Sequence, residues 1–585
     1  EETFGEDPAL AATMTEHVVS GLADSGVDAT LKHFVGHGRP AGGRNRARPT
    51  SSLREMRDAD LVPFRAGIEA GAPSVMAAYN TVDGVPCHAN ERLLTNLLRE
   101  EWGFTGTVVS DGRGIEMLAD DYGIAPDRQA AGVEALRAGI DVELPERECF
   151  GDRLVDAVRD GLVEESVVDR AVGRHLRQKR RAGLFEDPDP RPETMAEAFE
   201  APDVASLARR AARRSQVVLD NDGLLPLSAD TTVAVVGPNA DAPRNLLGNY
   251  SYAGAENADG GVDIRTPRAA LRERVDELRY ARGCGIRAGP DDDLDAAVAA
   301  AREADVVVAC VGGQSGIDVE RDSSGTAGEA LDRAELGLPG RQAALVSRVA
   351  ATGTPVAVVL ISGRPLAVPE VVETANATVA AWLPGQAGGA GIADVLLGTD
   401  PGGRLPVSLP RTVGQLPVDY RHPPVSDGEY VFTDAEPLFP FGHGESYAAF
   451  SYGELSVSPS QLSTDGSLTA SVPVENVAAR SGTEVVQLYA QHHGGRTVRP
   501  VRELVGFQRL ELAAGERATV EFDLSAATVA THDSAGNPIV EPGTVDLAVG
   551  RSSADFRARE TVELTGDPAS PERRPPIASS TVTFS

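Results

Sequence analysis

The sequence predicts a multidomain α/β protein in which part of a (β/α)8 barrel, an α/β sandwich and a C-terminal β-sandwich follow one another. Short β-rich runs alternate with amphipathic stretches over residues 1–185, and the same alternation returns over residues 206–420. From about residue 450, apolar and polar residues alternate with a period of two. A chain of 585 residues has room for about three or four such domains.

Residues 1–190 are expected to form the C-terminal part of the barrel. The predicted strands are Ala29–Phe34, Ser74–Ala78, Thr107–Ser110 and Ile140–Leu144, and the predicted helices are Leu93–Trp102, Gln129–Arg137 and a helical stretch over Arg153–Arg181. A closed barrel needs eight strands in about 250 residues. We therefore expect that the other strands of the barrel are missing at the N-terminal side.

Residues 206–420 are expected to form the α/β sandwich, after a Pro- and acid-rich linker at 191–205. The apolar runs Val233–Gly237, Asp305–Val311 and Pro355–Ile361 have the length and β-branched content of buried parallel strands, and Leu294–Glu303 and Gly340–Ala351 have helical patterns. A second linker is expected at 421–449.

Residues 450–565 are expected to form a β-sandwich of the fibronectin type III kind, because short alternating segments follow one another without helices. The predicted strands include Thr469–Asn476, Thr483–Gln491, Ala518–Leu524 and Gly543–Val549. Residues 566–585, rich in Pro, Ser and Arg, are expected to form a loosely held tail.

The charge is strongly negative, at −32, and only two of the 55 basic side chains are lysines, Lys32 and Lys179. Such a surface repels nucleic acid and anionic lipid, so we expect neither as a partner. Carboxylate excess with little lysine suits a halophilic protein, since salt screens the self-repulsion. A GC-rich genome is the alternative explanation. The compartment stays open, with the cytoplasm of a high-salt organism weakly favoured, and a homodimer is one option for the assembly.

The four cysteines, Cys87, Cys149, Cys284 and Cys310, lie far apart and show no metal-ligand spacing. Buried free thiols are therefore the favoured interpretation, and we expect neither a metal nor an organic cofactor.

Several polar residues stand at the ends of the predicted barrel strands, where catalytic groups gather in parallel barrels. Asp111 ends the third run; its alternative is a helix N-cap. Lys32 and His33 close the first run and are candidates for binding hydroxyl groups. Tyr79 ends the second run, where a turn at Asn80 is the alternative. Glu143 ends the fourth, where it could instead face solvent or an arginine.

A loop of about 25 residues, from Gly312 to Leu336, interrupts the predicted α/β sandwich. Loops of this length are uncommon unless they are functional or disordered. It carries Glu320, Asp322, Glu329 and Asp332 among its acidic residues. The alternative interpretation is a solvated acidic loop.

The ordered motifs of the chain resemble those of glycoside hydrolase family 3. In the first region these are Glu1-Glu-Thr-Phe-Gly-Glu-Asp-Pro8, Lys32-His-Phe-Val-Gly-His-Gly38, Ser74-Val-Met-Ala-Ala-Tyr-Asn80 and Val109-Ser-Asp111. Further matches are Gly328-Glu-Ala-Leu-Asp-Arg333, Pro440-Phe-Gly-His-Gly444 and Arg499-Pro-Val-Arg-Glu-Leu-Val-Gly-Phe507. The resemblance covers about 95% of the chain in the right order.

The resemblance implies an exo-acting β-glycosidase that removes terminal glucose or xylose with retention of configuration, its active site lying between barrel and sandwich. Asp111 matches the nucleophile and Glu329 the general acid/base, with Glu320 in reserve. Lys32 and His33 match a pair that binds sugar hydroxyls, and Tyr79 matches a residue beside the nucleophile. A β-linked oligosaccharide or glycoside is the expected substrate.

Two departures from the family pattern matter. Gly112 stands where the family often has an aromatic residue after the nucleophile. The family also has further barrel strands before the Glu1–Pro8 motif, which bring an aspartate and an arginine to the site. We therefore expect an N-terminally truncated sequence, with an inactive relative as the alternative.

Two other functions are kept as alternatives. One is a β-N-acetylhexosaminidase or phosphorylase on the same scaffold, which would use an Asp–His dyad in place of Glu329. The other is a carbohydrate-binding or structural protein without turnover.

Overall fold

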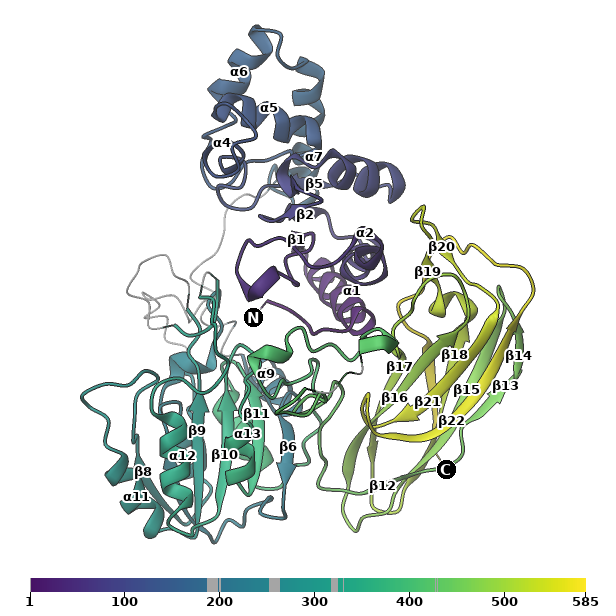
Figure 1. Cartoon of the computed structure of the whole chain (residues 1–585). Helices are drawn as coiled ribbons and strands as arrows, with labels where there is room; N and C mark the ends of the chain where they lie inside the picture. The colour runs from purple at the N-terminus through teal and green to yellow at the C-terminus, as the bar shows by residue number, and fades with distance from the viewer. Residues whose placement is uncertain are drawn as a thin grey trace. The chain divides into compact units, whose positions relative to one another are not determined.

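The computed structural model describes residues 2–186, 198, 201–251, 263–316, 325–329, 331–426, 428 and 430–584. They form two compact units. The N-terminal unit comprises Thr3–Pro190 and His532–Asn537, and the C-terminal unit comprises Glu1–Glu2, Arg191–Thr531 and Pro538–Ser585. Figure 1 follows the chain from purple at its N-terminus to yellow at its C-terminus.

The N-terminal unit alternates helices with short strands, as expected for βα units. Its elements are α1 (Pro8–Asp24), β1 (Thr30–Phe34), η1 (Ala41–Gly43), α2 (Leu53–Glu55), η2 (Met56–Asp60), α3 (Val62–Glu69), β2 (Ser74–Ala77), β3 (Thr81–Val82), β4 (Val85–Pro86), η3 (Cys87–Ala89), η4 (Arg92–Glu101), β5 (Thr107–Val109), α4 (Met117–Asp120), α5 (Arg128–Ala138), α6 (Asp152–Arg159) and α7 (Glu165–Arg181).

The central sheet of this unit is parallel and has the order β1-β2-β5. Its core is apolar, with Phe34, Val75, Leu94 and Val108 each 0% exposed. Side chains at the carboxyl ends of these three strands therefore lie along one edge of the sheet.

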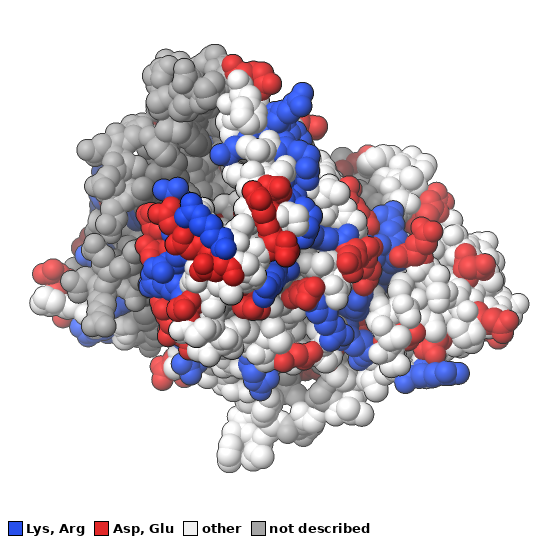
Figure 2. Space-filling view, turned by 90° about the horizontal axis from the view of Figure 1, so that it is seen from above, with Lys and Arg blue, Asp and Glu red and all other residues white. Residues whose placement is uncertain are grey.

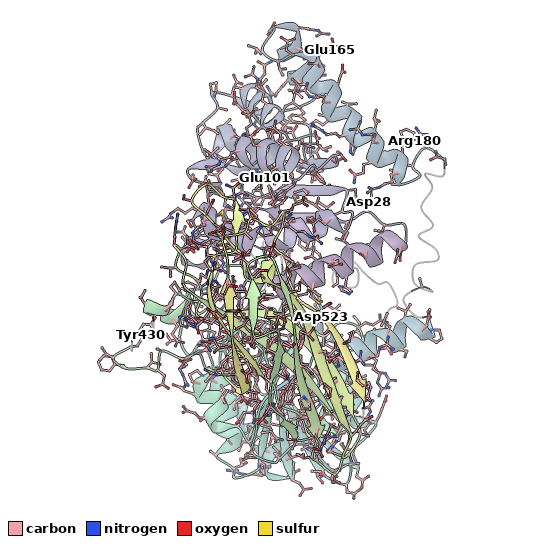
Figure 3. All side chains as sticks on the ribbon, turned by 90° about the vertical axis from the view of Figure 1, so that its right-hand side faces the viewer. Asp28, Glu101, Glu165, Arg180, Tyr430 and Asp523 are labelled. Carbon is pink, nitrogen blue, oxygen red and sulfur yellow. The ribbon has the colours of Figure 1, made fainter. Side chains whose placement is uncertain are left out.

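Two sequence expectations for this unit need correction. Ile140–Leu144 makes a single bridge, Val109 to Val142, and is no strand, because the Leu144 N–H donates to Oγ of Ser110 instead of continuing the ladder. The stretch Arg153–Arg181 divides into α6 and α7, which are separated at Gly161, a residue with a φ of 70°. Figure 3 shows α7 running from Glu165 to Arg180.

The first half of the C-terminal unit is a six-stranded sheet between helices. Its elements are α9 (Pro202–Arg214), β6 (Val217–Asn221), β7 (Thr232–Val236), η6 (Pro243–Leu246), α10 (Pro267–Arg272), β8 (Glu277–Ala281), α11 (Leu294–Arg302), β9 (Val306–Gly312), α12 (Gln342–Ala350), β10 (Val356–Ile361), α13 (Pro369–Thr374), β11 (Ala377–Trp382), α14 (Gly388–Leu396), η8 (Val413–Gln415) and η9 (Pro424–Ser426).

The strand order is β6-β11-β10-β9-β7-β8, and only β6 runs antiparallel to its neighbour. Apolar residues of α11, α12 and α13 pack on one face, and those of α10 and α14 pack on the other. The direction of winding changes between β7 and β9. In open α/β sheets, ligands bind outside the carboxyl ends of the strands at such a switch point.

The second half of the C-terminal unit is a β-sandwich. Its elements are β12 (Phe450–Tyr452), β13 (Ser456–Ser458), β14 (Gln461–Ser463), β15 (Ser467–Asn476), β16 (Gly482–His493), β17 (Glu503–Leu512), β18 (Arg517–Ser525), η10 (Ala526–Val529), β19 (Thr531–His532), β20 (Pro538–Ile539), β21 (Gly543–Gly550), β22 (Phe556–Thr565) and β23 (Ser579–Phe584). One sheet has the order β12-β15-β18-β23 with β13 beside β15, and the other has the order β14-β22-β21-β16-β17.

The expected tail at 566–585 is a further correction. It ends in β23, which pairs antiparallel with β18 from Asp523 opposite Ser579 to Ala518 opposite Phe584. Residues 421–449, expected as a linker, include Phe441, which is 2% exposed and stacks on Tyr420. Phe441 therefore packs within the C-terminal unit, whereas Val425, Val431 and Phe432 of the same stretch are exposed.

Acidic and basic side chains lie next to one another on the face shown in Figure 2. Ion pairs are frequent among the described residues, for example those of Arg128 with Asp120 and Glu148. Within the described ranges, the structure contains no helix that combines the length and the apolar character needed to cross a bilayer.

Candidate active site

The edge of the N-terminal sheet brings four of the predicted site residues together. Lys32 and His33 lie in the second half of β1, Tyr79 follows β2, and Asp111 follows β5. They meet because the three strands are parallel, so that their carboxyl ends share one edge, although the register of β1 against β2 shifts between Leu31 and Phe34.

One oxygen of the Asp111 carboxylate accepts a backbone hydrogen bond, and the other faces the ring of His33. The Gly112 backbone N–H donates to Oδ1 at 2.7 Å, and Nε2 of His33 lies 3.5 Å from Oδ2. Both side chains are 13% exposed. The alternative of a helix N-cap is wrong, because the next helix, α4, begins at Met117 and has Glu116 at its N-cap.

His33 is a neutral imidazole at ordinary pH. Burial, followed by the charges of His37 and Lys32, lowers its pKa to about 3. It therefore adds no positive charge beside Asp111 and can still act as a donor or acceptor toward a hydroxyl group.

Tyr79 is tied to the same turn, because its hydroxyl donates to the Gly112 carbonyl at 2.7 Å. The guanidinium of Arg46 lies 4.4 Å from the centre of the Tyr79 ring. Such a cation–π contact fixes the ring and places a positive charge at this edge of the sheet.

Glu143 accepts hydrogen bonds from the backbone of the loop that follows it. Its carboxylate accepts the N–H groups of Cys149 and Phe150, and burial raises its pKa. The expectation that it faces solvent or an arginine is wrong, because the side chain turns inward to these two donors.

The loop after β9 begins at the switch point of the C-terminal sheet. Asn239, which follows β7, is 0% exposed and donates to the carbonyls of Gly313 and Ile361. A bridge between Ser315 and Ala327 brings the two described ends of the loop together. The end that carries Glu329 is thereby fastened to the carboxyl end of β9.

Glu329 is half-buried, and its Oε2 accepts a hydrogen bond from the Tyr250 hydroxyl at 2.5 Å. The preceding Gly328 has a φ of 121°, and a β-carbon there would collide with the Gly316 carbonyl. The glycine therefore permits the close approach that presents Glu329. Glu320 lies outside the described residues, as does Asp322.

Asp111 belongs to the N-terminal unit and Glu329 to the C-terminal unit. Sequence reasoning missed His88 at the Asp111 backbone, Arg46 over the Tyr79 ring and Tyr250 beside Glu329. Residue type alone gave no signal for them, since each contact joins segments that are far apart in the chain.

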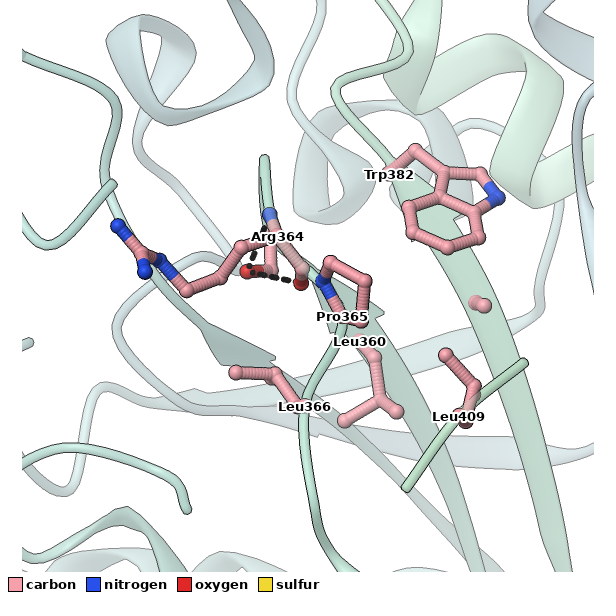
Figure 4. A pocket seen from close by; sticks show the side chains of 8 residues that line it. Leu360, Arg364, Pro365, Leu366, Trp382 and Leu409 are labelled. Carbon is pink, nitrogen blue, oxygen red and sulfur yellow. Dashed lines mark hydrogen bonds between the residues drawn. The ribbon is translucent and has the colours of Figure 1, made fainter. Parts of the chain in front are cut away.

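A small pocket at the carboxyl ends of β10 and β11 is lined mostly by apolar residues, unlike the polar edge around Asp111. Its lining residues are Leu360, Ser362, Arg364, Pro365, Leu366, Ala380, Trp382 and Leu409 (Figure 4). The Arg364 guanidinium points away from Trp382 and donates to the Leu331 carbonyl. The lining carries no carboxylate, so this pocket offers no acid or base. Among the residues that the structure describes, no group of three or more His, Cys, Asp or Glu side chains could hold a metal ion.

Comparisons with protein families match three regions of the chain. Residues 1–178 match the glycosyl hydrolase family 3 N terminal domain, and residues 216–447 match the glycosyl hydrolase family 3 C-terminal domain. Residues 484–553 match a fibronectin type III-like domain.

Individual relatives agree with the family matches. A β-xylosidase of Formosa agariphila is 35% identical over 97% of this chain and 80% of its own. A periplasmic β-glucosidase of Salmonella typhimurium is 34% identical over 94% of this chain and 76% of its own. The crystal structure of a β-glucosidase from Listeria innocua in complex with isofagomine is 32% identical, covers 97% of this chain and 80% of its own, and has a TM-score of 0.89.

The fold, the rim carboxylate and these matches define a multidomain α/β glycoside hydrolase with a C-terminal fibronectin type III-like domain. The chain belongs to glycosyl hydrolase family 3.

Proposed function

We propose that the chain is a retaining, exo-acting β-glycosidase that releases terminal β-linked glucose or xylose from oligosaccharides or glycosides. The observation that carries the proposal is the Asp111 carboxylate at the strand edge, 3.5 Å from the neutral ring of His33. Two of the relatives are a β-xylosidase and a β-glucosidase, which makes xylose and glucose the two candidate sugars.

In the first step Asp111 attacks the anomeric carbon while Glu329 gives a proton to the leaving oxygen. The bond from the anomeric carbon to the leaving oxygen breaks, and an ester to Asp111 forms. In the second step Glu329 takes a proton from water, which displaces Asp111 and regenerates the carboxylate. Retention requires the two carboxyl groups to stand about 5 to 5.5 Å apart when substrate is bound.

Lys32 and His33 are assigned to the sugar hydroxyls, because an ammonium group and a neutral imidazole offer donors beside the nucleophile. Tyr79 lines the region near the anomeric carbon, where its hydroxyl is held by the Gly112 carbonyl. Hydroxyl contacts that strengthen in the transition state lower the barrier, whereas uniform binding does not.

The test measures hydrolysis of 4-nitrophenyl β-glucoside and β-xyloside by the full chain, with the anomer of the first product determined by NMR. We expect the β-anomer first, and a loss of about 10³-fold or more in kcat for Asp111→Asn. Asp121→Asn, which changes an exposed carboxylate of the same unit, is the matched control. An α-anomer as the first product, or full activity of Asp111→Asn, would overturn the proposal.

A further inference from the structure

His88 is a fully buried histidine that the proposed chemistry leaves unused. It lies in η3 between Cys87 and Ala89 and is 1% exposed. A polar ring in such surroundings is stable only if its nitrogens find partners.

Both ring nitrogens of His88 have partners. The Asp111 backbone N–H donates to Nε2 at 3.1 Å. A second hydrogen bond joins the ring to the Ala78 backbone, and because it favours the protonated ring, the imidazole is its donor. Nδ1 therefore carries the proton and Nε2 keeps the lone pair that Asp111 uses.

Burial lowers the pKa of His88 to about 3, although the hydrogen bond to Ala78 acts in the opposite direction. The ring is therefore neutral at ordinary pH. Protonation at Nε2 would place two N–H groups against each other, so the neutral state is also the one that this geometry requires.

The turn after Asp111 is shaped around the same ring. A β-carbon at Gly114 would collide with Nε2 and Cε1 of His88. The Gly114 N–H donates to the Asp111 carbonyl at 3.0 Å and closes the turn. Absence of a side chain at position 114 thus allows the imidazole to reach the Asp111 backbone.

We propose that His88 is a positioning residue for the nucleophile: its ring holds the Asp111 backbone N–H and so fixes the direction in which the carboxylate faces the anomeric carbon. The inference rests on the proposed function, in which Asp111 is the nucleophile. His88 contributes through the backbone hydrogen bond, and the attacking oxygen belongs to Asp111.

The expected effect is on the attack itself. The hydrogen bond from the Gly112 N–H to Oδ1 joins two adjacent residues. It can therefore fix the carboxylate only if the backbone of residues 111 and 112 is itself fixed in place. His88 anchors that backbone to Ala78, which directly precedes Tyr79. A displacement of about 1 Å in such a group can cost about 10²-fold in rate.

The test uses 2-deoxy-2-fluoro-β-glucosyl fluoride and its xylosyl counterpart with the full chain. The Asp111 carboxylate attacks the anomeric carbon, the bond from that carbon to fluorine breaks, and fluoride leaves with the electron pair. The anomeric fluoride needs little acid assistance, so the rate of inactivation reports the attack with little contribution from Glu329.

Three variants separate the hydrogen bond from the bulk of the ring. His88→Met replaces the imidazole nitrogen with a thioether sulfur, which is a much weaker acceptor, and we expect the maximal inactivation rate to fall at least about 10-fold with the probe's binding constant changed less than about 3-fold. His88→Gln can place an oxygen near Nε2, and we expect it to recover most of the rate. Gly114→Ala keeps His88 but displaces its ring, so it should resemble His88→Met.

Two controls report general effects. His492→Gln changes another buried histidine, whose Nε2 bonds the Glu541 carbonyl in the C-terminal unit. Gly21→Ala adds a methyl group where nothing lies within 4 Å. We expect both to inactivate at the wild-type rate, and thermal unfolding identifies any variant that fails to fold.

The outcomes distinguish the two proposals. Labelling of the wild type on a residue other than Asp111, or on none, overturns the proposed function and with it this inference. Labelling on Asp111 with equal rates in the wild type, His88→Met and Gly114→Ala overturns the inference alone. A folded His88→Gln that is as slow as His88→Met also overturns it, because the hydrogen-bond acceptor would then not be the cause.

Discussion

Two neutral imidazoles contact Asp111 from different sides. His33 faces its carboxylate and His88 accepts from its backbone N–H, and burial is the largest cause that lowers the pKa of each ring to about 3. Neither ring changes its charge between pH 5 and 8, so neither contributes a pH-dependent charge beside Asp111 over that range.

The hydrogen bond from the Tyr250 hydroxyl to Glu329 leads to a prediction for a single residue. We expect Tyr250→Phe to lower kcat/KM about 10-fold for glycosides with poor leaving groups, such as alkyl glycosides, because the hydroxyl positions the acid that protonates them. Glycosides of 2,4-dinitrophenol need little protonation, and their kcat/KM should change less than about 3-fold. Steady-state kinetics over a series of leaving groups measures the difference.

Tyr280→Phe serves as the control for that series, since Tyr280 lies in β8 and its ring contacts Arg268 instead of the loop with Glu329. An equal loss for both kinds of leaving group in Tyr250→Phe would contradict the assignment of Tyr250 to the acid.

At the scale of the elements, a buried ion-pair cluster links β17 to two other segments of the chain. The carboxylate of Glu503 contacts the guanidinium groups of Arg421 and Arg574 at 2.6 and 2.8 Å. Burial alone would raise the pKa of Glu503, but the charges of Arg574 and Arg421 outweigh it and hold the pKa at about 2. The cluster joins three segments, namely the end of the α/β sandwich, β17 and the stretch before β23.

Because the folded pKa of Glu503 lies below the unfolded value, its stabilisation is complete above about pH 4.5 and is lost as the pH falls toward 2. We expect Glu503→Gln to lower the free energy of unfolding by about 3 kcal/mol or more at pH 7, since two buried arginines lose their partner. The difference from the wild type should shrink by about 1 kcal/mol between pH 7 and pH 4. Urea unfolding at both pH values measures it.

Glu511→Gln on the same strand is the matched variant. Its carboxylate is 58% exposed and pairs with Arg214, so we expect a loss of less than about 1 kcal/mol. A Glu503→Gln loss that stays constant from pH 7 to pH 4 would show that ionisation of Glu503 is not the source of the stability.

At the scale of the whole molecule, the net charge of −32 is the dominant electrostatic property. The 55 basic side chains can pair with some of the 87 acidic ones, as Arg99 does with Asp141 and Arg404 with Glu484, but 32 carboxylates remain in excess. The remaining carboxylates repel one another, and salt screens this repulsion over a Debye length that falls from about 10 Å at 0.1 M to about 3 Å at 1 M.

We therefore expect the Tm to rise by about 5 °C or more between 0.05 and 1 M NaCl and to level off above that, because screening is then nearly complete. Differential scanning calorimetry measures the Tm, and sucrose at equal osmolality controls for excluded-solute effects. A Tm that is independent of NaCl, or that rises equally in sucrose, would favour the GC-rich genome as the reason for the composition.

Much of the fold was predictable because the signals are local. Buried parallel strands such as β9 and β10 appear in the sequence as runs of β-branched residues. The strands of the β-sandwich appear as an alternation of buried and less buried residues. The segment at 140–144 forms only a bridge because side-chain oxygens replace backbone partners: the Val108 N–H donates to Oδ2 of Asp141, and the Leu144 N–H donates to Oγ of Ser110. The prediction of a loosely held tail at 566–585 was wrong because β23 has only six residues and follows a Pro-rich stretch, so its short alternating pattern is easily overlooked.

The sequence by itself determined the fold class, the family motifs and the positions of Lys32, His33, Tyr79 and Asp111 at strand ends, since periodicity and residue order are properties of neighbouring residues. Only the tertiary structure decided what surrounds them. His88 reaches Asp111 across 23 residues, and Tyr250 reaches Glu329 across 79. Such contacts depend on how distant segments pack, and no local pattern encodes that packing.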